Sequence, residues 1–173
     1  PALGFWAVTN EARPGLAFGP WLMYLPLTLV GLLVQTGAEE LAFRGYLQQQ
    51  VAARFRHPVF WMVIPSVLFG FLHYDPVSMG GNALIIVGAT TMFGLMAADL
   101  TARSGNLGAA WGMHFANNFF ALAVVAVEDT ITGLALYRTA YGAGDADIPL
   151  ASLALDFVVL ILAWGLCRRV VRR

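Results

Sequence analysis

Two adjacent glutamates and an arginine are the first residues in this sequence whose types and spacing could do chemistry. Glu39 and Glu40 end an apolar run, and Arg44 follows Glu40 by four positions. On a helix this spacing puts Glu40 and Arg44 on one face, where pairing lowers the cost of holding both charges in an apolar region. Glu39 lies about 100° round the helix and has no local cation. We therefore expect Glu39 to be the general base, the alternative being that all three residues solvate a helix end.

Two histidines stand inside other apolar segments. His73 closes the string Phe69-Gly-Phe-Leu-His73, and a lone histidine in such a place is more often a satisfied core residue than a catalytic one. His114 and Asn118 are four apart, so both project from one helix face. They could stabilise an oxyanion, bind a metal, or form an interhelical hydrogen bond. Asn117 is a neighbouring amide that spacing does not exclude.

The composition indicates a membrane protein. Of the 173 residues, 59% are hydrophobic and 12% are charged, and the mean hydropathy is +0.70. Soluble proteins carry about 25% charged residues. The net charge is zero, which gives no electrostatic basis for binding nucleic acid. All ten basic residues are arginine, a usage typical of a bacterial protein, and Cys167 is the one cysteine.

Apolar helices must position these polar residues. We predict an all-α polytopic bundle of about five or six membrane-embedded helices, forming a single domain over residues 1–173. Residues 1–19 are expected to be an interfacial or truncated N-terminal segment, and Glu128–Pro149 a long loop. The predicted spans are Pro20–Gly37 (able to continue as one helix to Arg54), Pro58–His73, Ala83–Leu100, Leu107–Val127 and Leu150–Leu166.

The arginines are unevenly distributed between the two sides of such a bundle. By the positive-inside rule, the side richer in arginine faces the cytoplasm. This predicts a cytoplasmic C-terminus in an integral protein of the bacterial inner (plasma) membrane, with the acidic loops outside. The arginine-rich side collects Arg54, Arg56, Arg103, Arg168, Arg169, Arg172 and Arg173.

Each of these signals is weak alone, but their order along successive spans is specific. The strings Glu39-Glu40-Leu-Ala-Phe-Arg44, Phe69-Gly-Phe-Leu-His73 and His114-Phe-Ala-Asn-Asn118 are complete. With them the chain resembles the CPBP family of intramembrane proteases, named for CAAX proteases and bacteriocin processing and also called Abi. The resemblance in motifs covers residues 39–118.

The resemblance implies a glutamate-dependent peptidase with its site in a cavity between helices. Glu39 would activate the attacking water, with His73 helping to hold it. His114 and Asn118 would stabilise the tetrahedral oxyanion, while Glu40 and Arg44 would fix the geometry of Glu39. Zinc is a possible cofactor with Glu39, His73 and His114 as candidate ligands, but no His-Glu-x-x-His arrangement is present and we predict no obligatory metal.

The expected partners are the lipid bilayer and a protein or peptide substrate, with no nucleic acid. Candidate substrates are a prenylated C-terminal tail, a peptide leader, or the C-terminal anchor of an exported protein. One alternative is a non-catalytic membrane immunity or scaffold protein of the same family, in which the polar residues hold helices together. Another is a proton- or ion-coupled transporter, but no inverted repeat supports it.

Overall fold

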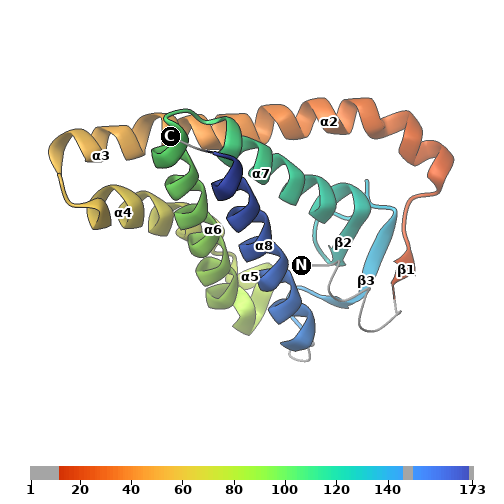
Figure 1. Cartoon of the computed structure of the whole chain (residues 1–173). Coiled ribbons are helices and arrows are strands. Elements are labelled where there is room, and N and C mark those ends of the chain that lie inside the picture. Colours follow the sequence, from red (N-terminus) through yellow and green to blue (C-terminus); the bar gives the residue numbers. More distant parts are fainter. Residues whose placement is uncertain (1–11, 146–149, 172–173) are drawn as a thin grey trace.

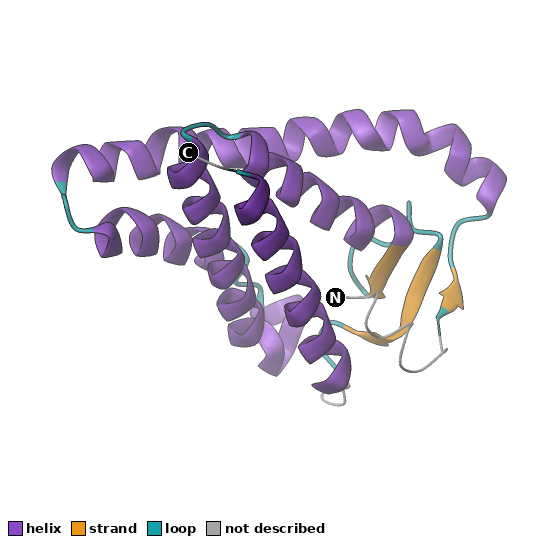
Figure 2. Ribbon diagram, in the orientation of Figure 1, coloured by secondary structure: helices purple, strands orange, loops and turns teal. Residues whose placement is uncertain are grey.

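A computed structural model describes residues 12–145 and 150–171, and most of them are helical (Figure 1). A small three-stranded sheet lies at one end of the helices (Figure 2). In chain order the elements are β1 (Arg13–Pro14), α2 (Phe18–Glu40), the π-helix η1 (Leu41–Leu47), α3 (Gln48–Arg54), α4 (Pro58–Phe71), α5 (Pro76–Met79), the 3-10 helix η2 (Gly80–Asn82), α6 (Ala83–Ser104), α7 (Gly108–Phe119), the π-helix η3 (Phe120–Val124), β2 (Val125–Glu128), β3 (Tyr137–Gly142) and α8 (Leu150–Val170).

The first long helix is continuous over 37 residues, as the sequence allowed, and runs along one edge of the molecule (Figure 1). Its buried side recurs at every fourth residue, whereas four residues of an α-helix overshoot one turn by about 40°. The π-helix η1 interrupts the α-helix, and its wider turns work against this drift. The buried stripe therefore stays on the side that faces the other helices. Its members are Thr28, Leu32, Thr36, Glu40, Arg44 and Gln48.

Helix α6 is the centre of the helical part and contacts α4, α7 and α8. Its approach to α4 depends on glycine: a Cβ at Gly70 of α4 would lie 2.0 Å from the Thr91 hydroxyl and 2.7 Å from the Val87 carbonyl oxygen. Small residues at such contacts let helix backbones approach closely. The core that results joins α4, α6 and α7 and consists of Phe69, Phe93, Met96, Ala97, Leu100, Ala110 and Met113.

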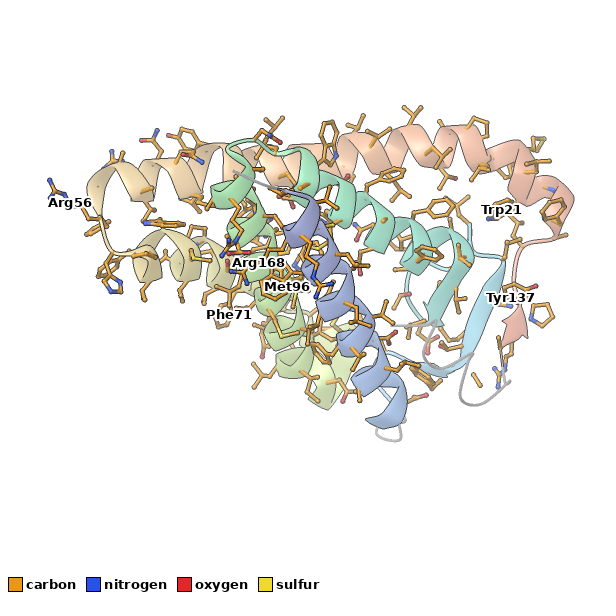
Figure 3. The ribbon with its side chains drawn as sticks, in the orientation of Figure 1. Trp21, Arg56, Phe71, Met96, Tyr137 and Arg168 are labelled. Carbon is orange, nitrogen blue, oxygen red and sulfur yellow. The ribbon has the colours of Figure 1, made fainter. Side chains whose placement is uncertain are left out.

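Polar contacts at Asp99 tie α8 to α6. The Asp99 carboxylate accepts from Arg103 Nε at 2.8 Å and from Trp164 Nε1 at 3.1 Å, and Arg168 Nε lies 3.4 Å away. The Arg168 guanidinium also stacks over the Trp164 ring, 4.9 Å from its centre. Figure 3 labels Arg168 between α8 and α6. This end of α8 is thus held by charge, while its other side chains are mostly apolar.

The sheet corrects the all-α prediction. The predicted span Leu107–Val127 leaves the helix at Val124 and becomes strand β2, because a run of β-branched valines favours extended backbone. The predicted loop Glu128–Pro149 contains β3, which pairs in parallel with β2 and antiparallel with β1.

Trp21 joins the long helix to the end of the molecule that carries the sheet. Its Nε1 donates to the Ala123 carbonyl at 2.8 Å, and Figure 3 labels it near Tyr137 of β3.

Among the described residues, two helices are long and apolar enough to cross a membrane: Phe18–Arg54 and Pro76–Ser104. Pro58–Phe71 is a shorter apolar helix. Most of the α2 side chains are exposed, including Leu27 at 72% and Val34 at 67%, a surface suited to lipid rather than water. The figure of five or six spanning helices stays a prediction. Residues 1–11 of the predicted N-terminal segment and 146–149 of the predicted loop lie outside the described residues.

We expect Gly70→Ala to destabilise the protein by about 1–3 kcal/mol, because the added methyl group overpacks the α4–α6 contact. Thermal unfolding of the purified protein in detergent micelles measures this as a lower Tm.

Gly88→Ala is the matched control, since a Cβ at Gly88 of α6 meets nothing within 4 Å. There the same substitution adds only helix propensity, worth about 1 kcal/mol, and should raise or preserve the Tm. Equal effects of the two substitutions would contradict the close α4–α6 contact.

Candidate active site

Glu40 is buried at the end of α2 and is the meeting point of three segments. Its Oε1 accepts from Arg44 Nη1 of η1 at 3.0 Å and from His114 Nδ1 of α7 at 2.8 Å. The predicted pairing of Glu40 with Arg44 is therefore present. Two charged or polar donors on one carboxylate offset the cost of burying it.

Arg44 is also buried and makes contacts with α4 and α6. Its Nη2 donates to the Gly94 carbonyl at 3.2 Å, and its guanidinium lies over the Phe69 ring, 4.6 Å from the centre. One turn further along the stripe, Gln48 Nε2 donates to the Ala98 carbonyl at 3.2 Å. The polar stripe of the long helix thus lies against small residues of α6. Their short side chains leave the backbone carbonyl oxygens of α6 accessible to Arg44 and Gln48.

Glu39 has a different environment from its neighbour. Its side chain keeps 29% of its surface exposed, and its Oε2 lies 3.7 Å from His114 Nε2. Its Oε1 accepts from the amide of Gln35, one turn earlier in α2. Oε2 makes no hydrogen bond among the described residues. Glu39 therefore has one oxygen held in place and one oxygen directed toward the His114 ring.

The two ring nitrogens of His114 have separate roles. A carboxylate can only accept, so Nδ1 carries the hydrogen that Glu40 receives, and in the neutral ring Nε2 bears a lone pair. The ring meets the Phe93 and Phe69 rings edge to face, at 4.9 and 5.9 Å between centres. Packing and the Glu40 hydrogen bond together hold Nε2 toward Glu39.

His73 lies two residues past the end of α4, where the chain leaves the helix. Its Nδ1 donates to the Phe69 carbonyl at 2.9 Å, which leaves the Nε2 lone pair available in the neutral ring. Its ring also packs against Phe69, 4.9 Å between centres. His73 and His114 thus share Phe69 as a neighbour and carry the same tautomer.

An amide relay connects α7 to Glu39. Asn117 Nδ2 donates to Asn118 Oδ1 at 3.2 Å, and Asn118 Nδ2 donates to Gln35 Oε1 at 3.1 Å. Gln35 in turn donates to Glu39. Sequence reasoning missed Gln35, although a position four residues before Glu39, on the same helix face, was a usable signal.

The two histidines and the two asparagines line a cavity of about 180 Å³ between α4, α6, α7 and α8, and Glu39 reaches it through its contact with His114. The structure brings Glu39, His114 and Asn118 together, and His73 lines the same cavity as His114 and Asn118. Asn117 also lines it, so both amides that the sequence left open reach the site. Its lining residues are Phe69, His73, Ala89, Thr90, Phe93, His114, Asn117, Asn118, Leu153, Asp156, Phe157 and Leu160.

The three candidate metal ligands do not come together as one group in the described part of the chain. Within the described ranges, no three His, Cys, Asp or Glu side chains lie close enough together to hold a metal ion. Glu39 and His114 face each other, but His73 is not grouped with them.

Comparison with known proteins agrees with the motifs. Residues 20–120 match the family described as type II CAAX prenyl endopeptidase Rce1-like, a stretch that contains all three motifs and confirms the resemblance to CPBP proteases. The uncharacterized protein YyaK of Bacillus subtilis (strain 168) is 33% identical over 113 residues, which cover 65% of this chain and 37% of that protein. The chain thus spans little more than a third of the length of this relative. No solved structure matches the chain.

We expect Arg44→Met to cost about 3–5 kcal/mol of stability, because it leaves the Glu40 carboxylate buried without its cation. Chemical denaturation in micelles measures the loss. The double variant Glu40→Gln with Arg44→Met removes both charges and should recover part of it.

Arg54→Met serves as the control, because Arg54 is exposed and bonds only within its own helix turn. It should change stability by no more than about 0.5 kcal/mol. A similar small effect for Arg44→Met would show that the buried pair does not support the fold.

Proposed function

Because this chain belongs to the Rce1-like family of type II CAAX prenyl endopeptidases, we propose that it is an intramembrane endopeptidase. It hydrolyses a peptide bond near a membrane-embedded or lipid-modified terminal segment of a substrate protein. The observation that carries the proposal is Glu39 Oε2 facing His114 Nε2 across 3.7 Å, where His114 also lines the cavity between the helices. Two atoms at this separation can both contact one water molecule.

In the first step, Glu39 takes a proton from that water. The water oxygen attacks the scissile carbonyl carbon, and the carbonyl π electrons move to oxygen. His73 lines the cavity beside His114, and its Nε2 lone pair is available to a group bound there, since Nδ1 of the ring is bonded to the Phe69 carbonyl. General-base assistance of this kind contributes about 10²–10⁴-fold to a rate.

In the second step, the tetrahedral oxyanion is stabilised and the carbon–nitrogen bond breaks. The Asn118 amide uses one hydrogen on Gln35 and has a second to donate. When His114 holds a proton on Nε2, it is a further donor, and Glu40 stabilises the positive ring through Nδ1. Glu39 then passes its proton to the leaving nitrogen, which restores the carboxylate.

Arg44, Glu40 and Gln35 act through their neighbours rather than on the substrate. Arg44 neutralises Glu40, and Glu40 orients His114. Gln35 holds the Oε1 oxygen of Glu39 and also bonds Asn118. Together they hold the base and the oxyanion donors at a constant distance from each other before the substrate binds. Such preorganisation accounts for a large part of the rate enhancement in many enzymes.

We place the site in the bacterial inner membrane, with the C-terminus cytoplasmic and the substrate the C-terminal anchor of an exported protein. The family is membrane-associated, and two helices of this chain are apolar enough to span a bilayer. His73 is followed by Tyr74 and Asp75 at the end of α4 opposite Arg54 and Arg56, so by the positive-inside rule the cavity opens toward the outer side.

We expect Glu39→Gln to lower processing by about 10²–10⁴-fold, because the amide cannot accept a proton from water. The test compares protein termini in the membrane and secreted fractions of cells that carry wild-type protein or the variant at equal expression. Precursors that keep an extra terminal segment only in the variant would identify the substrates.

Asp129→Asn is the control, since it also removes one carboxylate but lies exposed in the turn after β2. It should process normally. A native phenotype that persists in Glu39→Gln with no precursor would reject the peptidase and favour the non-catalytic immunity or scaffold protein.

Removal of metal is expected to leave cleavage unchanged, because the proposed steps use only side chains of the protein. Purified protein is treated with EDTA and 1,10-phenanthroline before a substrate from the previous experiment is added. Loss of activity that zinc alone restores would contradict this and make the site a metal centre.

A further inference from the structure

Helix α7 carries a third side chain that donates to α2, and the proposed mechanism does not use it. Besides His114 and Asn118, Trp111 reaches across from α7: its indole Nε1 donates to Thr36 Oγ1 at 3.1 Å. An indole N–H can only donate, and a buried one needs a partner. The Trp111 bond therefore ties together the two helices that carry the proposed base and the oxyanion donors.

The hydroxyl of Thr36 is a fixed acceptor for this bond. Thr36 is buried, and it donates its own hydroxyl hydrogen to the Leu32 carbonyl, one turn earlier in α2, at 2.7 Å. That bond orients the hydroxyl and leaves a lone pair of Oγ1 for the indole. Thr28 makes the same kind of bond, to the Tyr24 carbonyl at 3.0 Å, but among the described residues no other helix donates to its hydroxyl.

The Trp111 ring lies directly against the backbone of α2 at Gly37. A Cβ at Gly37 would come 2.8 Å from Cζ2 and 3.1 Å from Cε2 of the indole. Real Cβ atoms essentially never come so close, so a larger residue would push the ring, and α7 with it, away from α2. Gly31, earlier in the same helix, is different, since a Cβ there meets nothing within 4 Å.

Both contacts lie beside the groups whose spacing the proposed mechanism requires. Thr36 is four residues before Glu40 on the buried stripe of α2, and Trp111 is three residues before His114 on α7. Residues three or four apart share a helix face. The approach of α7 to α2 therefore decides whether His114 Nδ1 reaches Glu40 at 2.8 Å and whether Nε2 lies 3.7 Å from Glu39.

We propose that Trp111 is a positioning residue for the catalytic pair Glu39 and His114. Its bond to Thr36 and its contact with Gly37 hold α7 at the distance from α2 that this pair requires. Trp111 acts through His114 rather than on the substrate, so its loss slows the chemical step while substrate binding is retained. The role in catalysis rests on the proposed peptidase function.

The first measurement follows the His114 ring itself and needs no substrate. Protein with isotope-labelled histidine is purified in micelles, and NMR assigns the Nδ1–H resonance of His114 by its loss in His114→Gln. We expect Thr36→Val and Trp111→Phe to move this resonance upfield and to speed its exchange with water, because the bond to the Glu40 carboxylate lengthens. The Nδ1–H of His73, which is bonded to a carbonyl of α4, should keep its resonance.

Matched variants in α2 separate this effect from a general disturbance of the helix. Thr28→Val removes the same kind of hydroxyl, Gly31→Ala adds the same methyl group, and Thr36→Ser keeps the acceptor. All three should leave the His114 resonance as in the wild type. Gly37→Ala should move it in the same direction as loss of the indole does.

The second measurement asks whether this positioning matters for cleavage. With a substrate identified through Glu39→Gln, Thr36→Val and Trp111→Phe should each lower kcat by about ten- to a hundredfold. KM should change by less than about twofold. Because both substitutions remove one bond, the double variant should lose no more than either single variant. Thr28→Val should keep the wild-type kcat.

Three results would overturn the inference. An unchanged His114 resonance in Thr36→Val and Trp111→Phe would reduce Trp111 to a structural role, since a merely structural loss lowers the amount of folded protein but not the resonance of what remains folded. A shifted resonance with an unchanged kcat would reject the role in catalysis and leave the peptidase intact. A wild type that cleaves no more than Glu39→Gln would reject the proposed function itself, and the inference with it.

Discussion

The Glu40 carboxylate is the constraint on which the rest of the site depends. A buried carboxylate is costly unless it is paired and hydrogen-bonded. Here one oxygen of Glu40 accepts hydrogen bonds from both Arg44 and His114. Satisfying it requires η1 and α7 to meet at the end of α2. Arg44 then contacts the Gly94 carbonyl of α6 and the Phe69 ring of α4. The buried carboxylate and its arginine thus join five helical segments, α2, η1, α4, α6 and α7, and the geometry of the candidate site follows from that arrangement.

The two adjacent glutamates are divided by their position on one helix. Glu40 lies on the buried stripe and is committed to structure, whereas Glu39, about 100° round the helix, keeps part of its surface and one oxygen directed at His114. The π-helix that begins at Leu41 keeps Arg44 and Gln48 in line with Glu40, so the polar stripe reaches α6 without a break. Local departures from α-helix of this kind are frequent at functional sites.

The surroundings of the site are held by close packing on one side and by polar contacts on another. Helices α4 and α6 approach through Gly70, and the His114 ring packs edge to face against both the Phe69 and the Phe93 rings. Helix α8 is joined to α6 by the Asp99 cluster at one end, while its other half borders the cavity. The α8 side of the cavity is therefore joined to α6 by polar contacts near one end of the helix.

The sequence alone identified the candidate site residues and the helical segments that carry them. Glu39, Glu40, Arg44, His73, His114 and Asn118 were named from spacing, and the Glu40–Arg44 pair followed from helix geometry because i and i+4 are local. The sequence did not reveal that Gln35 bridges Glu39 and Asn118, nor that His114 donates a hydrogen bond to Glu40. The Asn118–Gln35 and His114–Glu40 hydrogen bonds each join residues more than 70 positions apart. The sheet was missed for the same reason: Val125–Glu128 continues an apolar helix in pattern, and only pairing with β3 makes it a strand. Local chemistry can be read from periodicity, whereas the choice between partners distant in sequence is made by tertiary packing.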